Sequence, residues 1–188
     1  VIELFKDDIY RNVIWFTLWQ AVLSAIIVLV FSFPGAYILS RYEFPGKGMV
    51  MAATTVPFII PSMVLAVGMI SLFSNNGNVN QLIDQINGST PLNLSHLDMI
   101  GNRSIIILAH IFFNFPLALR ILTARFNDLD ERMVWASRSL GSSRIRTFFR
   151  IILPQMRYSI LSSLSLVFTF CFLSFGIVLL LGGLNHTI

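Results

Sequence analysis

Histidine, cysteine and acidic side chains are the residues of this chain that could bind a metal or catalyse a reaction. The three histidines, His96, His110 and His186, lie far apart in the sequence and share no metal-ligand spacing. Cys171 is the single cysteine, which excludes an intrachain disulfide and a thiolate metal cluster. No nucleophile–base pair follows from the spacing of the serines, histidines and carboxylates. We therefore expect no catalytic residue, no metal site and no cofactor.

The most distinctive polar chemistry of the sequence lies in the stretch WASRSLGSSRIRTFFRIILPQ, residues 135–155. It contains four arginines and no acidic residue, and apolar runs long enough to cross a membrane lie on both sides of it. Guanidinium groups at such a density bind anionic lipid, nucleic acid or a partner protein. Which of these applies depends on the elements that position the stretch.

Composition assigns those elements to a membrane. Hydrophobic residues make up 55% of the chain, charged residues 12%, and the mean hydropathy is +0.77. Soluble domains contain roughly 25% charged residues. The apolar runs do not alternate as the strands of a barrel do. The sequence therefore predicts an all-α membrane protein that is a polytopic helical bundle.

Four apolar runs are long enough to span a bilayer, which needs about 20 residues as a helix. They cover residues 12–40, 49–73, 104–121 and 158–181. The first, second and fourth runs contain no Asp, Glu, Lys or Arg, which argues against a proton-coupled carrier and an intramembrane enzyme.

Prolines, which interrupt helices, and polar residues within the runs are candidates for lining a transport pathway. The second run contains Pro57 and Pro61, and the third contains His110 and Asn114, which share a helix face at i, i+4. Proline frees backbone groups that then need partners in protein or in a wet cavity. Ordinary kinking of the second run, and hydrogen bonding between helices from the third, are the alternatives.

Arginines are concentrated in the connection between the third and fourth runs. By the positive-inside rule, this connection and the 41–48 turn face the cytoplasm, and both ends of the chain face outward. An outward N-terminus without a signal peptide, beginning at Val1, predicts a piece of a longer protein. The connection and its flanks carry Arg120, Arg125, Arg132, Arg138, Arg144, Arg146, Arg150 and Arg157.

Residues 123–157 are predicted to form a helix–Gly–helix hairpin on the cytoplasmic face. Asp128, Asp130 and Glu131 suit the N-terminus of the first helix, and Gly141 suits the position just after its end. Ser142 or Ser143 can cap the second helix. That helix carries an apolar stripe at i, i+3, i+4 and i+7, predicted to pack the hairpin against the spans: Ile145, Phe148, Phe149 and Ile152.

Three interpretations of this hairpin compete. Its arginines could anchor it to anionic lipid, or the hairpin could dock on a cytoplasmic partner. Binding of nucleic acid is disfavoured, because the chain has no aromatic-plus-basic module and the surroundings are a membrane. The residues alone leave lipid anchoring and docking open.

The hairpin resembles the "EAA" loop of bacterial ABC importer permeases, which reads E-A-A-x3-G-x9-I-x-L-P. Ala136, Gly141, Ile151, Leu153 and Pro154 stand at the required spacing. Two positions depart from the pattern, since Trp135 replaces the glutamate and Ser137 replaces the second alanine. Glu131, one turn earlier, is an alternative carboxylate.

The resemblance implies a membrane subunit that couples to a separate cytoplasmic ATPase, since this chain contains no Walker motif. It also implies a periplasmic substrate-binding protein, a second permease half or subunit, and a bacterial inner-membrane location. The last core helix of the family fold is expected to be missing from these 188 residues. The coupling contacts it implies are Trp135, Ala136, Ser137, Leu140, Gly141, Ile151, Leu153 and Pro154.

Further stretches resemble one branch of that family. FTLWQAVLS and AYILSRYEFPGKG are similar to segments of the thiamine and ferric-iron permeases, in which two permease halves often share one chain. We expect the first half of such a chain, with thiamine as substrate. Ferric iron, a polyamine or an anion are the alternative substrates. A membrane scaffold whose basic loop binds lipid is the alternative from another class.

Overall fold

The computed structural model describes residues 8–89, 94–97 and 99–182, and within these ranges every regular element is helical. The prediction of an all-α membrane bundle is thus confirmed. His186 lies outside the described residues. The helices are α1 Asp8–Arg41, α2 Lys47–Ala53, α3 Val56–Ile59, α4 Ser62–Phe73, α5 Asn78–Ser89, α6 Arg103–Asn127, α7 Glu131–Ser139, α8 Arg144–Thr147, the π-helical turn η2 Phe148–Ile152, α9 Leu153–Phe172 and α10 Phe175–Gly182.

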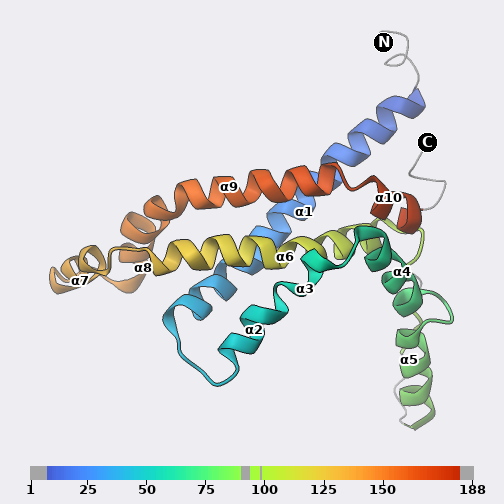
Figure 1. Cartoon of the computed structure of the whole chain (residues 1–188), viewed down its shortest axis with the longest axis horizontal. Coiled ribbons are helices and arrows are strands. Elements are labelled where there is room, and N and C mark those ends of the chain that lie inside the picture. Colours follow the sequence, from blue (N-terminus) through green and yellow to red (C-terminus); the bar gives the residue numbers. More distant parts are fainter. Residues whose placement is uncertain (1–7, 90–93, 98, 183–188) are drawn as a thin grey trace.

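Three long helices form the centre of the bundle (Figure 1). The segments Tyr10–Arg41, Arg103–Asn127 and Arg144–Phe172 are long and apolar enough to cross a membrane. Where α1, α6 and α9 meet, the buried contacts include Ala21, Ala25 and Ala118. Small residues at such positions let helix backbones approach closely, which is how membrane helices gain packing energy in lipid.

The second predicted span, residues 49–73, is not one helix. It is divided into α2, α3 and α4 (Figure 1), of which α3 and α4 contact α6. Ile60 adopts extended dihedral angles because a following proline, here Pro61, disfavours the helical region. Near the first break, Arg120 of α6 donates a hydrogen bond to Thr55 Oγ1 at 3.1 Å. Arg120 therefore contacts a polar residue at the break between α2 and α3.

The fourth predicted span, residues 158–181, is also divided. The helix begins earlier, because α8, η2 and α9 are continuous from Arg144, and it ends at Phe172. After Leu173 and Ser174 the chain continues as α10, which packs against α4 and α6. The apolar residues that join these three helices include Leu65, Ile105, Ile177 and Leu181.

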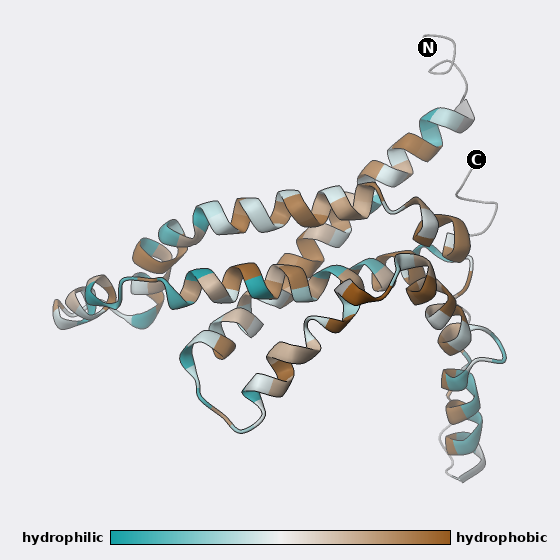
Figure 2. Ribbon diagram, viewed as in Figure 1, coloured by the Kyte–Doolittle hydropathy of each residue, from teal (hydrophilic) through white to brown (hydrophobic). Residues whose placement is uncertain are grey.

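The two ends of the bundle differ in chemistry. The α1–α2 turn and the α7–α8 hairpin lie at one end, which we call the hairpin end, and α5 extends from the other, which we call the loop end (Figure 1). Figure 2 shows hydrophilic residues prominent along α5 and near the hairpin, with apolar helices between them. The two connections predicted to face the cytoplasm therefore lie at the same end of the bundle.

At the loop end, Asn80 of α5 fixes the chain that returns to α6. Its side chain is buried, and its amide nitrogen donates to the carbonyl oxygens of Ser74, Asn75 and Leu97 at 3.1, 3.3 and 3.1 Å. Its side-chain oxygen accepts from Leu97 N at 2.8 Å. All hydrogen-bonding atoms of a buried amide are thereby used, which gives this connection a defined path.

The close approach of α1 to α6 at Gly35 allows the packing between these two helices to be tested. A Cβ at this position would lie 3.1 Å from Leu119 Cδ1, whereas a Cβ on Gly68 of α4 would meet no atom within 4 Å. We expect Gly35→Leu to overpack the α1–α6 contact and destabilise the bundle by about 1–3 kcal/mol. Gly68→Leu is the control and should change stability by less. Thermal unfolding in detergent measures both, and equal effects would contradict the packing described.

Candidate functional site

In the hairpin between α6 and α9, a side-chain hydrogen bond caps the start of each short helix. Asp130 Oδ1 accepts from Arg132 N at 2.9 Å and caps the start of α7. Ser143, rather than Ser142, caps α8, because its Oγ accepts from Arg146 N at 3.3 Å. Each cap of this kind is worth about 1 kcal/mol. The short helices are therefore held in shape by their own sequence.

Gly141 ends α7 in the way that the sequence predicted. Its φ is +83°, which glycine adopts without steric cost. Gly141 N donates to Arg138 O at 3.0 Å and Ser142 N donates to Ser137 O at 3.1 Å. These two bonds are those of a Schellman motif, so the chain reverses tightly at the tip of the hairpin.

The tip exposes apolar side chains that have little contact with the rest of the chain. Trp135 is 64% exposed and Leu140 is 87% exposed. Ala136 and Gly141 are exposed as well, and a Cβ on Gly141 would meet nothing within 4 Å. Ser137 instead turns inward, with its Oγ 3.2 Å from Thr147 Oγ1 of α8. Trp135, Ala136 and Leu140 thus expose apolar surface on α7 and at the turn that follows it.

The predicted apolar stripe of the second helix is only half buried. Phe148 packs on the bundle and Ile152 is buried, but Ile145 is 73% exposed and Phe149 is 60% exposed. Phe148, Phe149 and Ile152 lie in the π-helical turn η2, so their spacing around the helix axis differs from that of a regular α-helix. Pro154 has no N–H to donate to Arg150 O, and the wider turn accommodates that missing bond.

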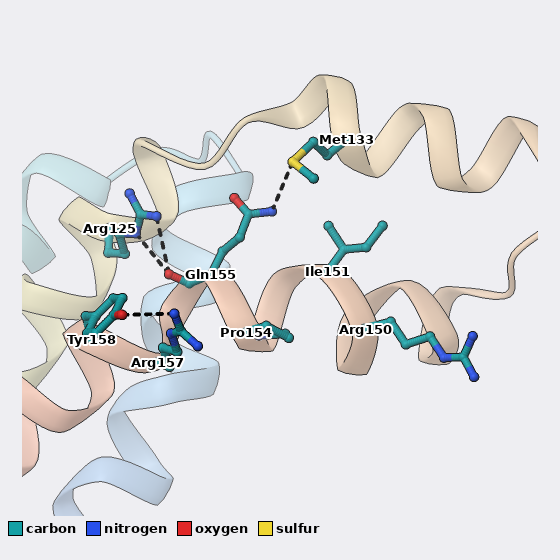
Figure 3. A pocket seen from close by; sticks show the side chains of 8 residues that line it. All are labelled: Arg125, Met133, Arg150, Ile151, Pro154, Gln155, Arg157 and Tyr158. Atoms are coloured by element: carbon teal, nitrogen blue, oxygen red, sulfur yellow. Dashed lines mark hydrogen bonds between the residues drawn. The ribbon is translucent and has the colours of Figure 1, made fainter.

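The two exposed residues of the stripe line a groove instead of packing on the spans. The groove has a volume of about 520 Å³ and lies between the hairpin and the end of α1. Its wall includes Tyr37 and Tyr42, together with Ile145 and Phe149. Ile151 and Pro154 face a different groove, on the side of Arg125 and Arg157 (Figure 3). The motif residues therefore lie on separate surfaces of the hairpin rather than on one.

Contacts with all three long helices anchor the hairpin. Phe126 of α6 packs edge-on against Phe33 and Tyr37 of α1, with ring centroids 5.2 and 5.7 Å apart. Phe33 also packs against Phe148 at 6.0 Å. In addition, Arg41 at the end of α1 forms an ion pair with Glu131 of α7. A displacement of the hairpin must therefore move, or break away from, the ends of α1 and α6.

The role of Glu131 follows from that ion pair. Its carboxylate binds an arginine of the same chain, so it supports the base of the hairpin and does not lie at the exposed tip. Sequence reasoning missed the pair because its members are 90 positions apart. The charge pattern predicted that the two connections lie at the same end of the bundle, but the pairing depends on how α1 packs against α6.

The candidate pathway residues occupy different environments. His110 and Asn114 lie inside the α1–α6–α9 bundle and are 0% and 2% exposed. Pro57 is buried and Pro61 is exposed. In this conformation His110 and Asn114 do not face an open path, and their role in a pathway stays a prediction.

The buried polar residues of the bundle meet around Cys171 of α9. Asn114 Nδ2 donates to Cys171 Sγ at 3.4 Å and to His110 O at 2.9 Å. Gln20 Nε2 of α1 donates to Cys171 O at 3.3 Å. Neither ring nitrogen of His110 has a protein partner among the described residues, and the same holds for Gln20 Oε1 and Asn114 Oδ1. The cluster joins three helices but satisfies only part of its polar atoms.

No metal site arises from these residues. Within the described part of the chain, no group of three or more His, Cys, Asp or Glu side chains is placed to hold a metal ion. His96 is instead 2.6 Å from the carboxylate of Asp84, on the exposed surface of the loop end.

A pair of substitutions tests the polar cluster. We expect His110→Leu to leave stability unchanged or raise it by about 1 kcal/mol, because a buried polar group without partners is replaced by an apolar one. Asn80→Leu, the contrasting variant, removes a fully bonded buried amide and should cost about 1–3 kcal/mol. Unfolding midpoints in detergent measure both. A strong loss of stability in His110→Leu would show that the imidazole has structural partners in solution.

Residues 35–188 match the family described as "Binding-protein-dependent transport system inner membrane component". The chain is 33% identical over 178 residues to the thiamine transport system permease protein ThiP of Brucella abortus (strain 2308), covering 94% of this chain and 32% of that protein. It is 28% identical over 183 residues to the probable sulfate transport system permease protein cysT of Prototheca wickerhamii, covering 97% of this chain and 68% of that protein.

The fold is shared with a solved bacterial ABC transporter involved in the import of the acidic polysaccharide alginate. The TM-score is 0.79 at 18% identity, over 99% of this chain and 65% of that chain. The alginate transporter has also been solved in complex with an alginate pentasaccharide-bound periplasmic protein, with the same TM-score. The present chain spans 32% of the length of the thiamine permeases. By its sequence match over residues 35–188, this chain belongs to the family of binding-protein-dependent transport system inner membrane components.

Proposed function

We propose that this chain is the membrane-spanning part of an ATP-driven importer and that its hairpin docks on a separate cytoplasmic ATPase subunit. The observation that carries this proposal is the exposed apolar tip formed by Trp135, Ala136, Leu140 and Gly141. Exposed apolar patches on a protein surface mark sites of association. The tip lies beyond the ends of the long helices (Figure 1), where a partner in solution can reach it.

The hairpin is built to transmit force from such a partner. A docked ATPase would move α7, and the ion pair between Glu131 and Arg41 would carry that movement to α1. The contact of Phe148 with Phe33 adds a second connection to α1. Since η2 continues into α9, the same movement acts directly on a third long helix. The spans would then rock between inward-open and outward-open states.

The polar cluster at His110, Asn114 and Gln20 is where such rocking would have its largest chemical effect. These residues lie between helices that must separate for a path to open, and several of their polar atoms are unpaired in the closed bundle. Separation would let water or solute bind them, which lowers the cost of the open state. This supports, for His110 and Asn114, the pathway role predicted from their spacing.

Thiamine is the substrate we propose. The support is the 33% identity over 94% of this chain to a thiamine permease protein. Sulfate, ferric iron, a polyamine or another anion are the alternatives, and sulfate is favoured among them by the 28% identity to a probable sulfate permease protein. A periplasmic binding protein would deliver the substrate to the loop end, and a second permease half or subunit would complete the path.

The orientation follows from charge. We propose that the hairpin end faces the cytoplasm of a bacterium and that the loop end faces outward from its inner membrane, because arginines are concentrated at the hairpin end. The competing function is a membrane scaffold whose basic hairpin only binds lipid. That function needs the arginines but not the apolar tip.

Gly141→Glu in the full-length protein tests docking. We expect co-purification of the ATPase to fall about tenfold or more, because a charged side chain projects from the tip that must approach the partner. Gly46→Glu is the matched control, since Gly46 also has positive φ, at +90°, and open space around its Cβ, but lies in the α1–α2 turn. Both variants carry the same backbone strain of about 1–2 kcal/mol. Equal retention of the ATPase by both variants would favour the scaffold.

Uptake separates the candidate substrates. We expect a strain that lacks this permease to lose accumulation of radiolabelled thiamine and to regain it with the wild-type gene, because the chain then supplies the path. Sulfate uptake in the same strains is the parallel measurement. Restoration of sulfate uptake alone would reassign the substrate without affecting the docking proposal.

A further inference from the structure

A basic groove at the junction of α6, α7 and α9 is separate from the hairpin tip (Figure 3). Its volume is about 420 Å³. Three arginines line it, Arg125, Arg150 and Arg157, and they alternate with the apolar side chains of Met133, Ile151 and Pro154. The groove therefore combines positive charge with an apolar floor.

Among the described residues, no carboxylate lines this groove to neutralise the arginines. Of the acidic residues near the groove in sequence, Asp130 caps α7, Glu131 pairs with Arg41, and Asp128 is not among the residues that line the groove. Guanidinium groups that line a hollow attract an anion, and the planar guanidinium binds phosphate oxygens in a bidentate geometry.

Two of the arginines are held in place by the protein. Arg125 Nε and Nη2 both donate to Gln155 O at 3.3 Å, a contact that joins α6 to α9. Arg157 lies over the ring of Tyr158, 4.6 Å from its centroid, and its Nη2 donates to Tyr158 Oη at 2.9 Å. Figure 3 shows these two side chains on either side of the Gln155 carbonyl, whereas Arg150 extends away at the other end. Arginines positioned in this way lose less entropy when they bind a ligand.

The depth of the groove identifies the source of the anion. Tyr158 begins the uncharged run of residues 158–181, and Arg125 lies two positions before the end of α6. This is the level at which tyrosine and arginine side chains meet lipid headgroups. Basic pockets between spans on the cytoplasmic side bind anionic headgroups. A soluble anion would make no use of the apolar floor.

We propose that this groove binds one anionic phospholipid, with the phosphate between Arg125 and Arg157 and the glycerol region against Ile151 and Pro154. The lipid would bridge α6 and α9 directly beneath the hairpin. The orientation rests on the proposed function, since only the cytoplasmic leaflet reaches this end of the chain. The binding itself does not require the ATPase, so the two proposals can fail separately.

The experiment is a lipid titration of the full-length permease in neutral detergent, followed by native mass spectrometry. The probes are phosphatidylglycerol and, as the uncharged comparison, phosphatidylcholine. We expect one phosphatidylglycerol to bind at least about tenfold more tightly than phosphatidylcholine, since each arginine near a lipid surface adds about fivefold to the affinity. Arg157→Gln should weaken that binding about fivefold, and Arg125→Gln with Arg157→Gln about 25-fold.

Arg146→Gln is the matched control, because Arg146 is exposed on the same hairpin but does not line this groove. It should leave phosphatidylglycerol binding unchanged. Arg157→Gln keeps the Arg125–Gln155 contact between helices, so it reports on binding even if the double variant unfolds. Its co-purification with the ATPase should equal that of the wild type.

Four results would overturn the proposal. Equal weakening by Arg146→Gln would mean diffuse attraction to the whole basic hairpin. Unchanged binding in Arg157→Gln would exclude the groove. Displacement of the lipid by millimolar inorganic phosphate would identify a soluble anion as the ligand. Loss of lipid binding when the ATPase assembles would assign the groove to the protein interface.

Discussion

Phe126 packs edge-on against Phe33 and Tyr37 where α1 and α6 end together, and the position of the hairpin depends on this contact. Each edge-to-face pair contributes about 0.5–1.5 kcal/mol beyond the area it buries. Leu122 and Met156 are buried in the same cluster, so α9 is fixed at the same point. Packing against three helices therefore fixes the position of the hairpin relative to the bundle.

Backbone chemistry sets a second constraint. In lipid every peptide group needs a partner, and proline removes one donor wherever it occurs. The chain meets this constraint in different ways at different prolines. At Pro61 the helix breaks, while at Pro154 it widens into a π-helical turn and continues. Pro34 lies inside α1 without ending it. The consequence of each proline depends on its neighbours, so the sequence alone does not predict whether an apolar run stays one continuous helix.

Polar residues inside the bundle show a further compromise. Asn114 and Gln20 join α6 and α1 to Cys171 of α9, yet each keeps one polar atom without a protein partner. An apolar layer would pack these helices at lower cost in this conformation. The proposed pathway role would account for this cost, because the unpaired polar atoms would stabilise a state in which the helices separate.

The sequence by itself determined the class of protein and the local form of the hairpin. Composition and the length of the apolar runs can be read from the residues without any tertiary structure. The loop motif is also local, because Gly141 suits a helix end that needs a positive φ. Acidic residues including Asp130 likewise indicated the start of α7, and Ser142 or Ser143 indicated the start of α8. The resemblance to the importer family rested on these local signals and is confirmed.

Only the tertiary structure decided how these parts are connected. The ion pair of Arg41 with Glu131 joins residues 90 positions apart, and no local pattern specifies it. Phe149 of the π-helical turn is exposed, although its spacing in the sequence placed it in the apolar stripe. Arg125 and Arg157 became neighbours of one groove because α6 and α9 pack side by side. These outcomes depend on which helix faces pack, and that choice is made by the whole bundle at once.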